Sequence, residues 1–469
     1  MLMENLETDI VVIGGGPGGY TAALYAAAKG KTVVLVEKDS RLGGVCLNRG
    51  CIPSKALLHA AGTIDAAGEA EKFGIGFSGF SVDLSVLQDW KSGILEKLAQ
   101  GISNLTARRG VKVVRAEASF ENATAFRAGG RRISFKNAII ATGSLPAIPQ
   151  PFKIGNPRVM TSTEALDLRD IPGKLLVIGG GYIGMELGAV YASLGSEVTV
   201  VEALEGLLNG ADQDLVRYVD ESARKRFKNV YLASRVLNLA EEGGLIKAAI
   251  ETGGKVFEEK FDRVLVSVGR VSSTQGLNLE SAGIKVDEKG FIVTDDSKQT
   301  ASPSVYAVGD VTGGVMLAHK ASREARIAVD AILGESVPVK TPVIPAVVFT
   351  DPEVAWCGLT ETEARIRNVH VQVVRFPWSA SGRAAAVGRT EGVTKLIIDP
   401  ATEKIIGAGI CGKGAGELIS AAVMAVELGM TAGELGDMVY PHPTLSETLT
   451  ECAEMFYGRA IHAFSRKRV

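Results

Sequence analysis

An apolar run of strand length near the start of the chain passes directly into a glycine-rich turn. Asp9 to Ile13 has the pattern of a buried strand, Gly14-x-Gly16-x-x-Gly19 follows, and an alanine-rich helical pattern continues to about Lys29. A second apolar run, Thr32 to Val36, ends at the acid Glu37. Strand, glycine turn, helix, strand and acid in this order predict a βαβ unit that binds a dinucleotide.

The same order occurs a second time. Leu175 to Ile178 precedes Gly179-x-Gly181-x-x-Gly184, and a helical segment to about Leu194 leads to the strand Val198 to Val201 and then Glu202. Such glycines let the backbone approach a pyrophosphate at a helix N-terminus, and the acid accepts hydrogen bonds from ribose hydroxyls. One such motif is weak evidence in a chain with 55 glycines, but two copies in full context predict two dinucleotide sites.

The remaining pattern predicts an α/β protein with a different final domain. Apolar strands that lead into glycine turns end near Ser144, Arg270 and Asp310. Further on, short strands and two long helices, Ala415 to Leu428 and Leu445 to Tyr457, indicate an α+β domain. We expect two Rossmann-like domains, a central segment and a C-terminal domain, with the ranges 1–150, 151–272, 273–342 and 343–469.

Composition excludes several classes of protein. The chain has 51 lysines and arginines against 53 aspartates and glutamates, which does not suggest a nucleic-acid binder. The 19 uncharged residues from Ile10 to Ala28 contain the first glycine motif, so we do not expect them to span a membrane. We find no secretory or transit pattern, and five cysteines are too few for a disulfide framework. We therefore expect a cytoplasmic protein.

The most specific segment runs from Gly43 to Lys55 and contains two of the five cysteines, Cys46 and Cys51. Pro53 predicts a helix start, so Cys51 is expected near a helix N-terminus with Lys55 close by, and both features favour a thiolate. No second Cys/His pair has zinc spacing, and no metal is expected. Two buried, inert cysteines are the simple alternative, but a redox-active disulfide is the favoured hypothesis.

A histidine between two prolines is the second candidate. His442 follows Pro441 and precedes Pro443, and Glu447 lies five residues further on. A thiol must lose its proton before it attacks a disulfide, and a histidine whose other nitrogen faces a carboxylate is a suitable base. Taken alone, such a loop histidine is more often structural.

The segment Cys46-Leu-Asn-Arg-Gly-Cys51-Ile-Pro-Ser-Lys55 resembles the redox motif of the pyridine nucleotide–disulfide oxidoreductases, and within them the dihydrolipoamide dehydrogenase branch. The resemblance covers nearly the whole chain, including Ala307 to Asp310, Met316 to Lys320, Ile344 to Thr350 and His442 to Glu447. It implies FAD in the first domain, NAD in the second and a homodimer built through the C-terminal domain. The implied reaction oxidises dihydrolipoamide to lipoamide and reduces NAD+ to NADH.

The resemblance also assigns roles. Cys46 corresponds to the thiol that meets the substrate, and Cys51 to the thiolate against the flavin. Lys55 pairs with Glu186, and His442 with Glu447 is the base. The implied partners are lipoyl domains of a 2-oxo acid dehydrogenase acyltransferase or the carrier protein of glycine cleavage.

The cofactor residues follow from the same resemblance. Those assigned to FAD are Gly14, Gly16, Gly19, Glu37, Lys38, Gly44, Lys55, Ala118, Thr142, Gly143, Ser144, Asp310, Met316, Leu317, Ala318 and His319. Those assigned to NAD are Gly179, Gly181, Tyr182, Ile183, Gly184, Glu186, Glu202, Val236 and Gly269.

Some residues depart from the family pattern. Tyr182 stands where the lipoamide enzymes often have an aliphatic residue, and in glutathione reductases a tyrosine there can cover the flavin. Rival hypotheses are a glutathione-, mycothione- or mercuric-type reductase, or a non-catalytic FAD-binding protein. A mercuric reductase needs a C-terminal cysteine pair, and Cys452 is alone. We expect Cys357, Cys411 and Cys452 to be apolar fillers, and His462 has no assigned role.

Overall fold

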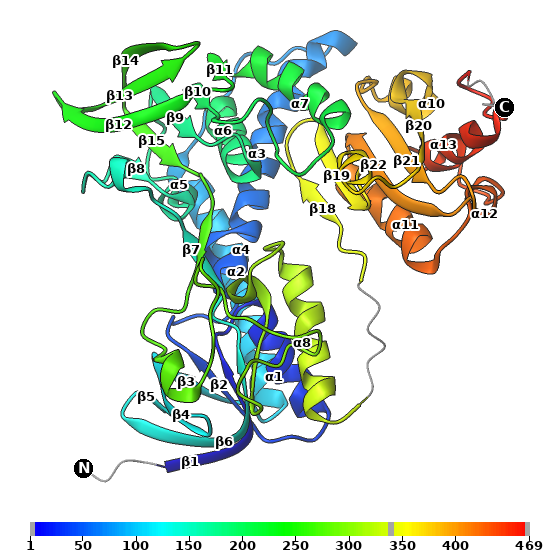
Figure 1. The fold of residues 1–469 in the computed structure, drawn as a ribbon. Helices are drawn as coiled ribbons and strands as arrows, with labels where there is room; N and C mark the ends of the chain where they lie inside the picture. Colours follow the sequence, from blue (N-terminus) through cyan, green and yellow to red (C-terminus); the bar gives the residue numbers. More distant parts are fainter. Residues whose placement is uncertain (1–4, 336–341, 465–469) are drawn as a thin grey trace.

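The first nucleotide-binding unit forms the sheet at the bottom of Figure 1. The computed structural model describes residues 5–335 and 342–464. Strand β1 (Asn5–Ile13), helix α1 (Pro17–Ala28) and strand β2 (Val33–Glu37) have nearly the predicted bounds. The sheet has the order β3-β2-β1-β6-β5-β4, and β17 pairs with β6. Its other strands are β3 (Lys112–Arg115), β4 (Ala118–Asn122), β5 (Ala125–Ala128), β6 (Arg131–Ile140) and β17 (Val305–Ala307).

The second unit repeats this arrangement. Strand β9 (Lys174–Ile178), helix α6 (Tyr182–Ser193) and strand β10 (Glu197–Val201) form its βαβ core. The sheet β11-β10-β9-β15-β8 is parallel throughout and also contains β8 (Val159–Met160), β11 (Asn229–Tyr231) and β15 (Arg263–Val266). Two Rossmann-like units are therefore present, as predicted.

Helices α2 (Gly44–Arg49) and α3 (Cys51–Glu69) carry the cysteine pair. The predicted helix start at Pro53 is confirmed to within two residues, because α3 begins at Cys51 and Pro53 lies in its first turn. The first four N–H groups of a helix have no partner within it, so a proline is tolerated in the first turn. Further along α3, Leu57 is buried in the same apolar cluster as Met185 of α6. Helix α3 thus joins the two nucleotide-binding units.

A three-stranded antiparallel sheet packs beside the second unit and was not singled out in the sequence. It consists of β12 (Arg235–Glu242), β13 (Leu245–Thr252) and β14 (Lys255–Phe261). The remaining elements before the C-terminal part are α4 (Leu84–Arg108), β7 (Ser144–Pro146), α5 (Ser162–Asp167), α7 (Gln213–Arg226), β16 (Arg270–Ser272) and α8 (Ala318–Ile332).

The C-terminal part is an antiparallel sheet covered by helices, as the α+β prediction required (Figure 1). The sheet order is β18-β19-β22-β21-β20, formed by β18 (Ala346–Val348), β19 (Glu353–Gly358), β20 (Gln372–Pro377), β21 (Val393–Ile398) and β22 (Ile405–Gly412). Its helices are α9 (Glu361–Ile366), α10 (Gly382–Ala386), α11 (Ala415–Leu428), α12 (Ala432–Gly436) and α13 (Glu447–Tyr457). Cys357, Cys411 and Cys452 are free and buried, which confirms their prediction as fillers.

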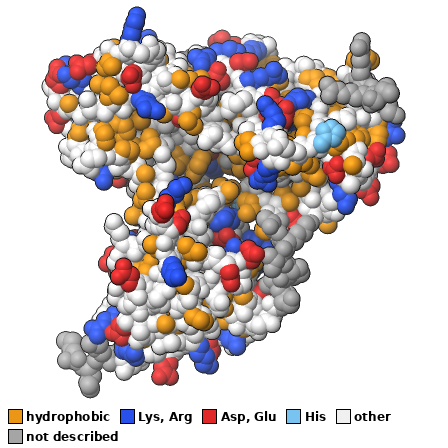
Figure 2. Space-filling view, viewed as in Figure 1, with side chains coloured by type: hydrophobic (Ala, Val, Ile, Leu, Met, Phe, Trp, Pro, Cys, Tyr) orange, Lys and Arg blue, Asp and Glu red, His pale blue; other side chains and the backbone are white. Residues whose placement is uncertain are grey.

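The surface is mixed in character. Lysine and arginine side chains alternate with aspartate and glutamate over the face drawn in Figure 2. Within residues 5–335 and 342–464, no helix is both long enough and apolar enough to cross a membrane.

Candidate functional site

The first glycine motif forms a cradle that side chains would fill. Gly14 has φ +103°, and a Cβ there would lie 2.4 Å from the carbonyl oxygen of Ala141. A Cβ at Gly19 would lie 1.7 Å from the carbonyl oxygen of Gly14. Glu37 ends β2 beside this turn, and its Oε2 accepts a hydrogen bond from the N–H of Gly15 at 2.6 Å. A helix N-terminus, a close backbone and a carboxylate fit the pyrophosphate and ribose of a dinucleotide.

The second motif repeats the cradle in detail. Gly179 has φ +106°, and a Cβ there would lie 2.6 Å from the carbonyl oxygen of Ser267. A Cβ at Gly184 would lie 2.1 Å from the carbonyl oxygen of Gly179. Glu202 accepts from the N–H of Gly180 at 2.6 Å. The residues present therefore fit a dinucleotide in this unit as well.

Each cradle opens into a pocket, and the two pockets adjoin. Tyr182, Ile183 and Arg270 line both of them. The predicted FAD residues that line the first pocket are Gly14, Gly16, Glu37, Lys38, Gly44, Lys55, Ala118, Thr142, Gly143, Ser144, Asp310, Met316 and Ala318. The predicted NAD residues that line the second are Gly179, Gly181, Tyr182, Ile183, Glu202, Val236 and Gly269.

Five predicted cofactor residues lie elsewhere. Gly19 and Gly184 pack beneath their own turns, where they allow the close contact described above. Leu317 does not line the first pocket, and His319 Nε2 instead lies 2.7 Å from the carbonyl oxygen of Pro345. Glu186, assigned to NAD, lines the first pocket.

The two cysteines lie in the wall of the first pocket and differ electrostatically. Both are free thiols in the structure, and Cys46 donates a hydrogen bond to Cys51. This bond and the nearby Lys55 ammonium, acting against burial, lower the pKa of Cys51 to about 7. The same bond and burial raise the pKa of Cys46. The thiolate of the pair is therefore on Cys51, as the position at a helix N-terminus predicts.

A buried carboxylate holds the lysine beside this pair. Glu186 on α6 is 2% exposed. Its Oε2 accepts from Lys55 Nζ at 2.7 Å and from Ser54 Oγ at 2.8 Å. The resemblance assigned the Lys55–Glu186 pair, and the structure brings these two residues together from α3 and α6.

Arg270 is a site residue that the sequence analysis did not assign. Its Nε donates to Ser144 Oγ at 2.7 Å, and Ser144 Oγ donates to Asp310 Oδ2 at 2.5 Å. This chain of contacts spans the boundary between the two pockets. The available signal was its position directly after Gly269, at the end of an apolar strand, where the first unit has Gly143 and Ser144.

His442 and Glu447 form the predicted pair but lie away from the cysteines. His442 Nδ1 is 2.8 Å from Glu447 Oε1, and the N–H of Thr444 donates to Glu447 Oε2 at 2.7 Å. Although burial acts in the opposite direction, these two hydrogen bonds lower the pKa of Glu447. The His442 side chain is 76% exposed, and neither residue lines either of the two pockets described above. Helix α13 lies at the outer edge of the C-terminal part (Figure 1).

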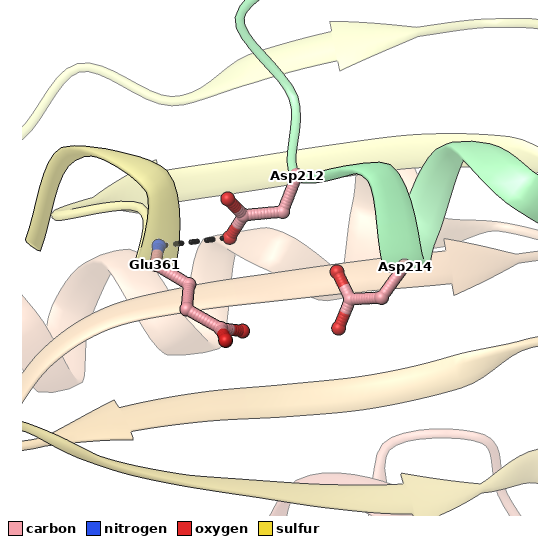
Figure 3. A group of neighbouring side chains, drawn as sticks. All are labelled: Asp212, Asp214 and Glu361. Carbon is pink, nitrogen blue, oxygen red and sulfur yellow. Dashed lines mark hydrogen bonds between the residues drawn. The ribbon is translucent and has the colours of Figure 1, made fainter. Parts of the chain in front are cut away.

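Three carboxylates elsewhere lie close enough together to suggest a metal site. Within the described part of the chain these are Asp212, Asp214 and Glu361, from α7 and α9 (Figure 3). Lys395 Nζ, however, lies 2.6 Å from Asp212 Oδ2, 2.7 Å from Asp214 Oδ1 and 3.7 Å from Glu361 Oε2. Arg375 also pairs with Asp214 and Glu361. Side-chain cations therefore neutralise this cluster, so its charge does not require a metal ion.

Comparison with known proteins places these observations in one family. Residues 8–325 match the model described as pyridine nucleotide-disulphide oxidoreductase, and residues 344–453 match the dimerisation domain of the same family.

Two relatives of similar length resemble the chain in sequence. The chain is 40% identical over 472 residues to a protein named dihydrolipoyl dehydrogenase from Buchnera aphidicola, with 99% of each chain covered. A protein of the same name from Staphylococcus aureus is 40% identical over 461 residues, covering 97% of this chain and 98% of the relative.

Solved structures agree in fold. The LpdA protein of Mycobacterium tuberculosis has a TM-score of 0.87 at 27% identity, covering 95% of this chain and 99% of its own. The HOCl-induced flavoprotein disulfide reductase RclA of Escherichia coli has a TM-score of 0.86 at 29% identity, covering 96% and 99%.

Proposed function

The chain belongs to the pyridine nucleotide–disulphide oxidoreductase family, and from this premise we propose that it oxidises dihydrolipoamide to lipoamide and reduces NAD+ to NADH. The observation that carries the proposal is the cysteine pair with Lys55 and Glu186, in the wall of one dinucleotide pocket where a second adjoins it. Relatives that cover nearly the whole chain bear the name of this activity.

The two cradles divide the cofactors between them. The first, with Gly14, Glu37 and Asp310, would hold FAD, and the second, with Gly179 and Glu202, would hold NAD. When bound, FAD supplies the electron transfer between the cysteine pair and the nicotinamide. Glu202 favours NAD over NADP, because a carboxylate accepts from a ribose 2′-hydroxyl and repels a 2′-phosphate.

In the oxidised protein Cys46 and Cys51 would be joined in a redox-active disulfide, and this pair carries out the exchange with the substrate. His442 takes the proton from one thiol of dihydrolipoamide, and the resulting thiolate attacks the sulfur of Cys46. A substrate–Cys46 disulfide forms, the Cys46–Cys51 bond breaks, and Cys51 leaves as a thiolate. The second substrate thiol then attacks the substrate sulfur of the mixed disulfide. The bond from that sulfur to Cys46 breaks, lipoamide closes, and the proton of the second thiol passes to the released Cys46 sulfur. The lowered pKa of Cys51 suits it as the leaving group.

The position of His442 supports a site shared between two chains. His442 belongs to the segment that matches the family's dimerisation domain, and it lines neither pocket of its own chain. In a two-fold dimer, each cysteine pair would receive the partner's His442, and two equivalent sites would form. A refolded equimolar mixture of Cys46→Ser and His442→Gln chains should then recover roughly a quarter of wild-type activity, since about half of the dimers are mixed and each of these has one intact site of two.

The wider assignments are part of the same proposal. We assign the ranges 1–150, 151–272, 273–342 and 343–469 to the FAD-binding, NAD-binding, central and interface domains. Lipoyl domains of a 2-oxo acid dehydrogenase acyltransferase or a glycine cleavage carrier are the proposed partners. A cytoplasmic location is part of the same proposal.

One purification tests the proposal. The protein should be yellow with one FAD per chain, and should reduce NAD+ with dihydrolipoamide far faster than it uses glutathione disulfide or mercuric ion with NADH or NADPH. Cys51→Ser should keep FAD and lose turnover. A colourless protein, or one that prefers another disulfide or mercuric ion, contradicts the proposal, and equal efficiency with NADP contradicts the role of Glu202.

A further inference from the structure

Phe349 comes from the C-terminal part of the chain, directly after β18, yet it touches both members of the Lys55–Glu186 pair. Its backbone N–H donates to Glu186 Oε1 at 3.0 Å. Its ring lies beneath Lys55 Nζ, which is 4.4 Å from the ring centroid. One residue therefore contacts the carboxylate through its main chain and the ammonium through its side chain.

The backbone contact completes the partners of a buried carboxylate. Glu186 Oε2 already accepts from Ser54 and Lys55, whereas Oε1 accepts from Phe349. Because Glu186 is 2% exposed, water contributes little to either oxygen. A charged group at this depth depends on its hydrogen bonds, and the N–H of Phe349 fixes the orientation of the carboxylate that holds Lys55.

The ring contact places a negative surface against the ammonium. A cation over the face of an aromatic ring is attracted by the ring quadrupole, and the attraction grows as water is removed. The start of α11 lies near the same ring, since a Cβ added at Gly416 would come 3.3 Å from Phe349 Cε1. Lys55 Nζ therefore contacts the ring of Phe349 on one side and the carboxylate of Glu186 on the other.

We propose that Phe349 is a positioning residue of the reaction: its N–H orients Glu186 and its ring fixes the Lys55 ammonium beside the cysteine pair. The proposal rests on the proposed function, in which Lys55 and Glu186 serve the cysteine chemistry. Because Phe349 belongs to the C-terminal part, Lys55 is placed correctly only when this part packs against the nucleotide-binding part.

The test separates the ring from the backbone. Phe349→Leu and Phe349→Met keep the N–H and most of the volume but remove the ring, whereas Phe349→Tyr keeps the ring. In the FAD-loaded dimer, we expect the Leu and Met variants to lose about five- to thirty-fold in kcat, and the Tyr variant to stay close to wild type. Phe376→Leu, in the core of the same sheet, is the matched control and should lower Tm without lowering turnover per folded molecule.

A second readout needs neither substrate nor cofactor. Labelling of Lys55 by acetic anhydride in the apoprotein, located by mass spectrometry, should be faster in the Leu and Met variants and unchanged in Phe349→Tyr and Phe376→Leu. If the Leu and Met variants keep wild-type kcat and wild-type labelling, or if the Tyr variant loses as much as they do, the proposal is overturned. A wild-type protein that does not oxidise dihydrolipoamide would contradict the proposed function, whereas the labelling pattern still decides the placement of Lys55.

Discussion

Two lysines lie where the nucleotide-binding part meets the C-terminal part, and their environments are opposite. Lys55 pairs with Glu186 and faces the ring of Phe349, and 33% of its side chain is exposed. Lys395 on β21 pairs with Asp212 and Asp214 of the second nucleotide-binding unit, and 1% of its side chain is exposed. Each lysine is held by acids from an element distant in sequence, but only the Lys55 ammonium lies in the wall of a pocket.

The difference shows what makes a paired lysine functional. The Lys395 cluster is closed by its own partners, since Arg375 supplies a second cation and the N–H groups of α9 donate to Asp212. Nothing that binds the protein can use this charge, so its effect is on the docking of the two parts. Lys55 has a free side toward the cysteine pair, and its charge lowers the pKa of Cys51. A buried lysine whose charge is fully paired, such as Lys395, contributes to stability. A paired lysine that also faces a pocket, such as Lys55, can act on reacting groups.

Replacing each lysine by methionine should lower a different quantity in each case, stability for Lys395 and turnover for Lys55. Lys395→Met leaves buried carboxylates short of a cation, so we expect the free energy of unfolding to fall by about 3–5 kcal/mol. Lys55→Met removes a charge directed at the reacting sulfurs, so we expect kcat to fall about 100- to 1,000-fold. Denaturant titration and turnover per folded molecule of both variants measure the two effects.

The expected result is a crossed pattern. Lys395→Met should retain turnover per folded molecule. Lys55→Met leaves Glu186 with the hydrogen bonds from Ser54 and Phe349, so it should lose less stability than Lys395→Met. Equal loss of stability in both variants would contradict the distinction between the two sites.

The sequence predicted the local parts of the site and missed the contacts between distant segments. The glycine cradles follow from a motif and its neighbours, so Gly14, Glu37, Gly179 and Glu202 were placed correctly beside their turns. Asp212 and Lys395 are 183 positions apart, and Glu186 and Phe349 are 163 apart. No periodicity or spacing relates such residues, because their contact depends on how the C-terminal sheet docks.

The sequence was also imprecise about two local features, the first residue of α3 and the strands β12 to β14. The helix start was set at Pro53, although the unpaired N–H groups of a first turn allow the proline at its third position. Strands β12 to β14 were not singled out, because many of their residues are exposed and their apolar pattern is interrupted.

The stability that Asp212 contributes through its pairing with Lys395 should fall in acid. Burial acts against it, but hydrogen bonds from Lys395 and α9 lower the pKa of Asp212 to about 2, below its ordinary value of 3.8. The stabilisation is therefore complete above about pH 4 and is lost as the pH falls toward 2, about 2 kcal/mol in total. We expect the stability gap between wild type and Asp212→Asn to narrow over this range, measured by urea titration at each pH. A gap that stays constant down to pH 2 would contradict the assignment.

The charge of Lys55 should instead affect the reactivity of the Cys51 thiol. The hydrogen bond from Cys46 and, after it, the Lys55 ammonium lower the pKa of Cys51 to about 7. We expect Lys55→Met to raise the pKa of Cys51, because one of these two causes is removed. The rate of Cys51 alkylation by iodoacetamide in the reduced apoprotein, followed by mass spectrometry across pH, measures the shift. Lys395→Met is the control and should leave the profile unchanged, and a profile that moves equally in both variants would remove the contrast.

A third lysine, whose carboxylate partners are exposed, gives the comparison its lower limit. Lys247 on β13 has two carboxylate partners, Glu242 at 2.9 Å and Glu258 at 3.2 Å. Lys395 likewise has two carboxylates within 2.7 Å, with Glu361 further away at 3.7 Å. The Glu242 and Glu258 side chains are 48% and 60% exposed, and water and salt screen their interaction with Lys247. We expect Lys247→Met to change Tm by about 1 °C or less, and the change to shrink further in high salt. Thermal melts at two salt concentrations measure this. A loss as large as that of Lys395→Met would mean that the number of partners, rather than their burial, determines what such a lysine contributes to stability.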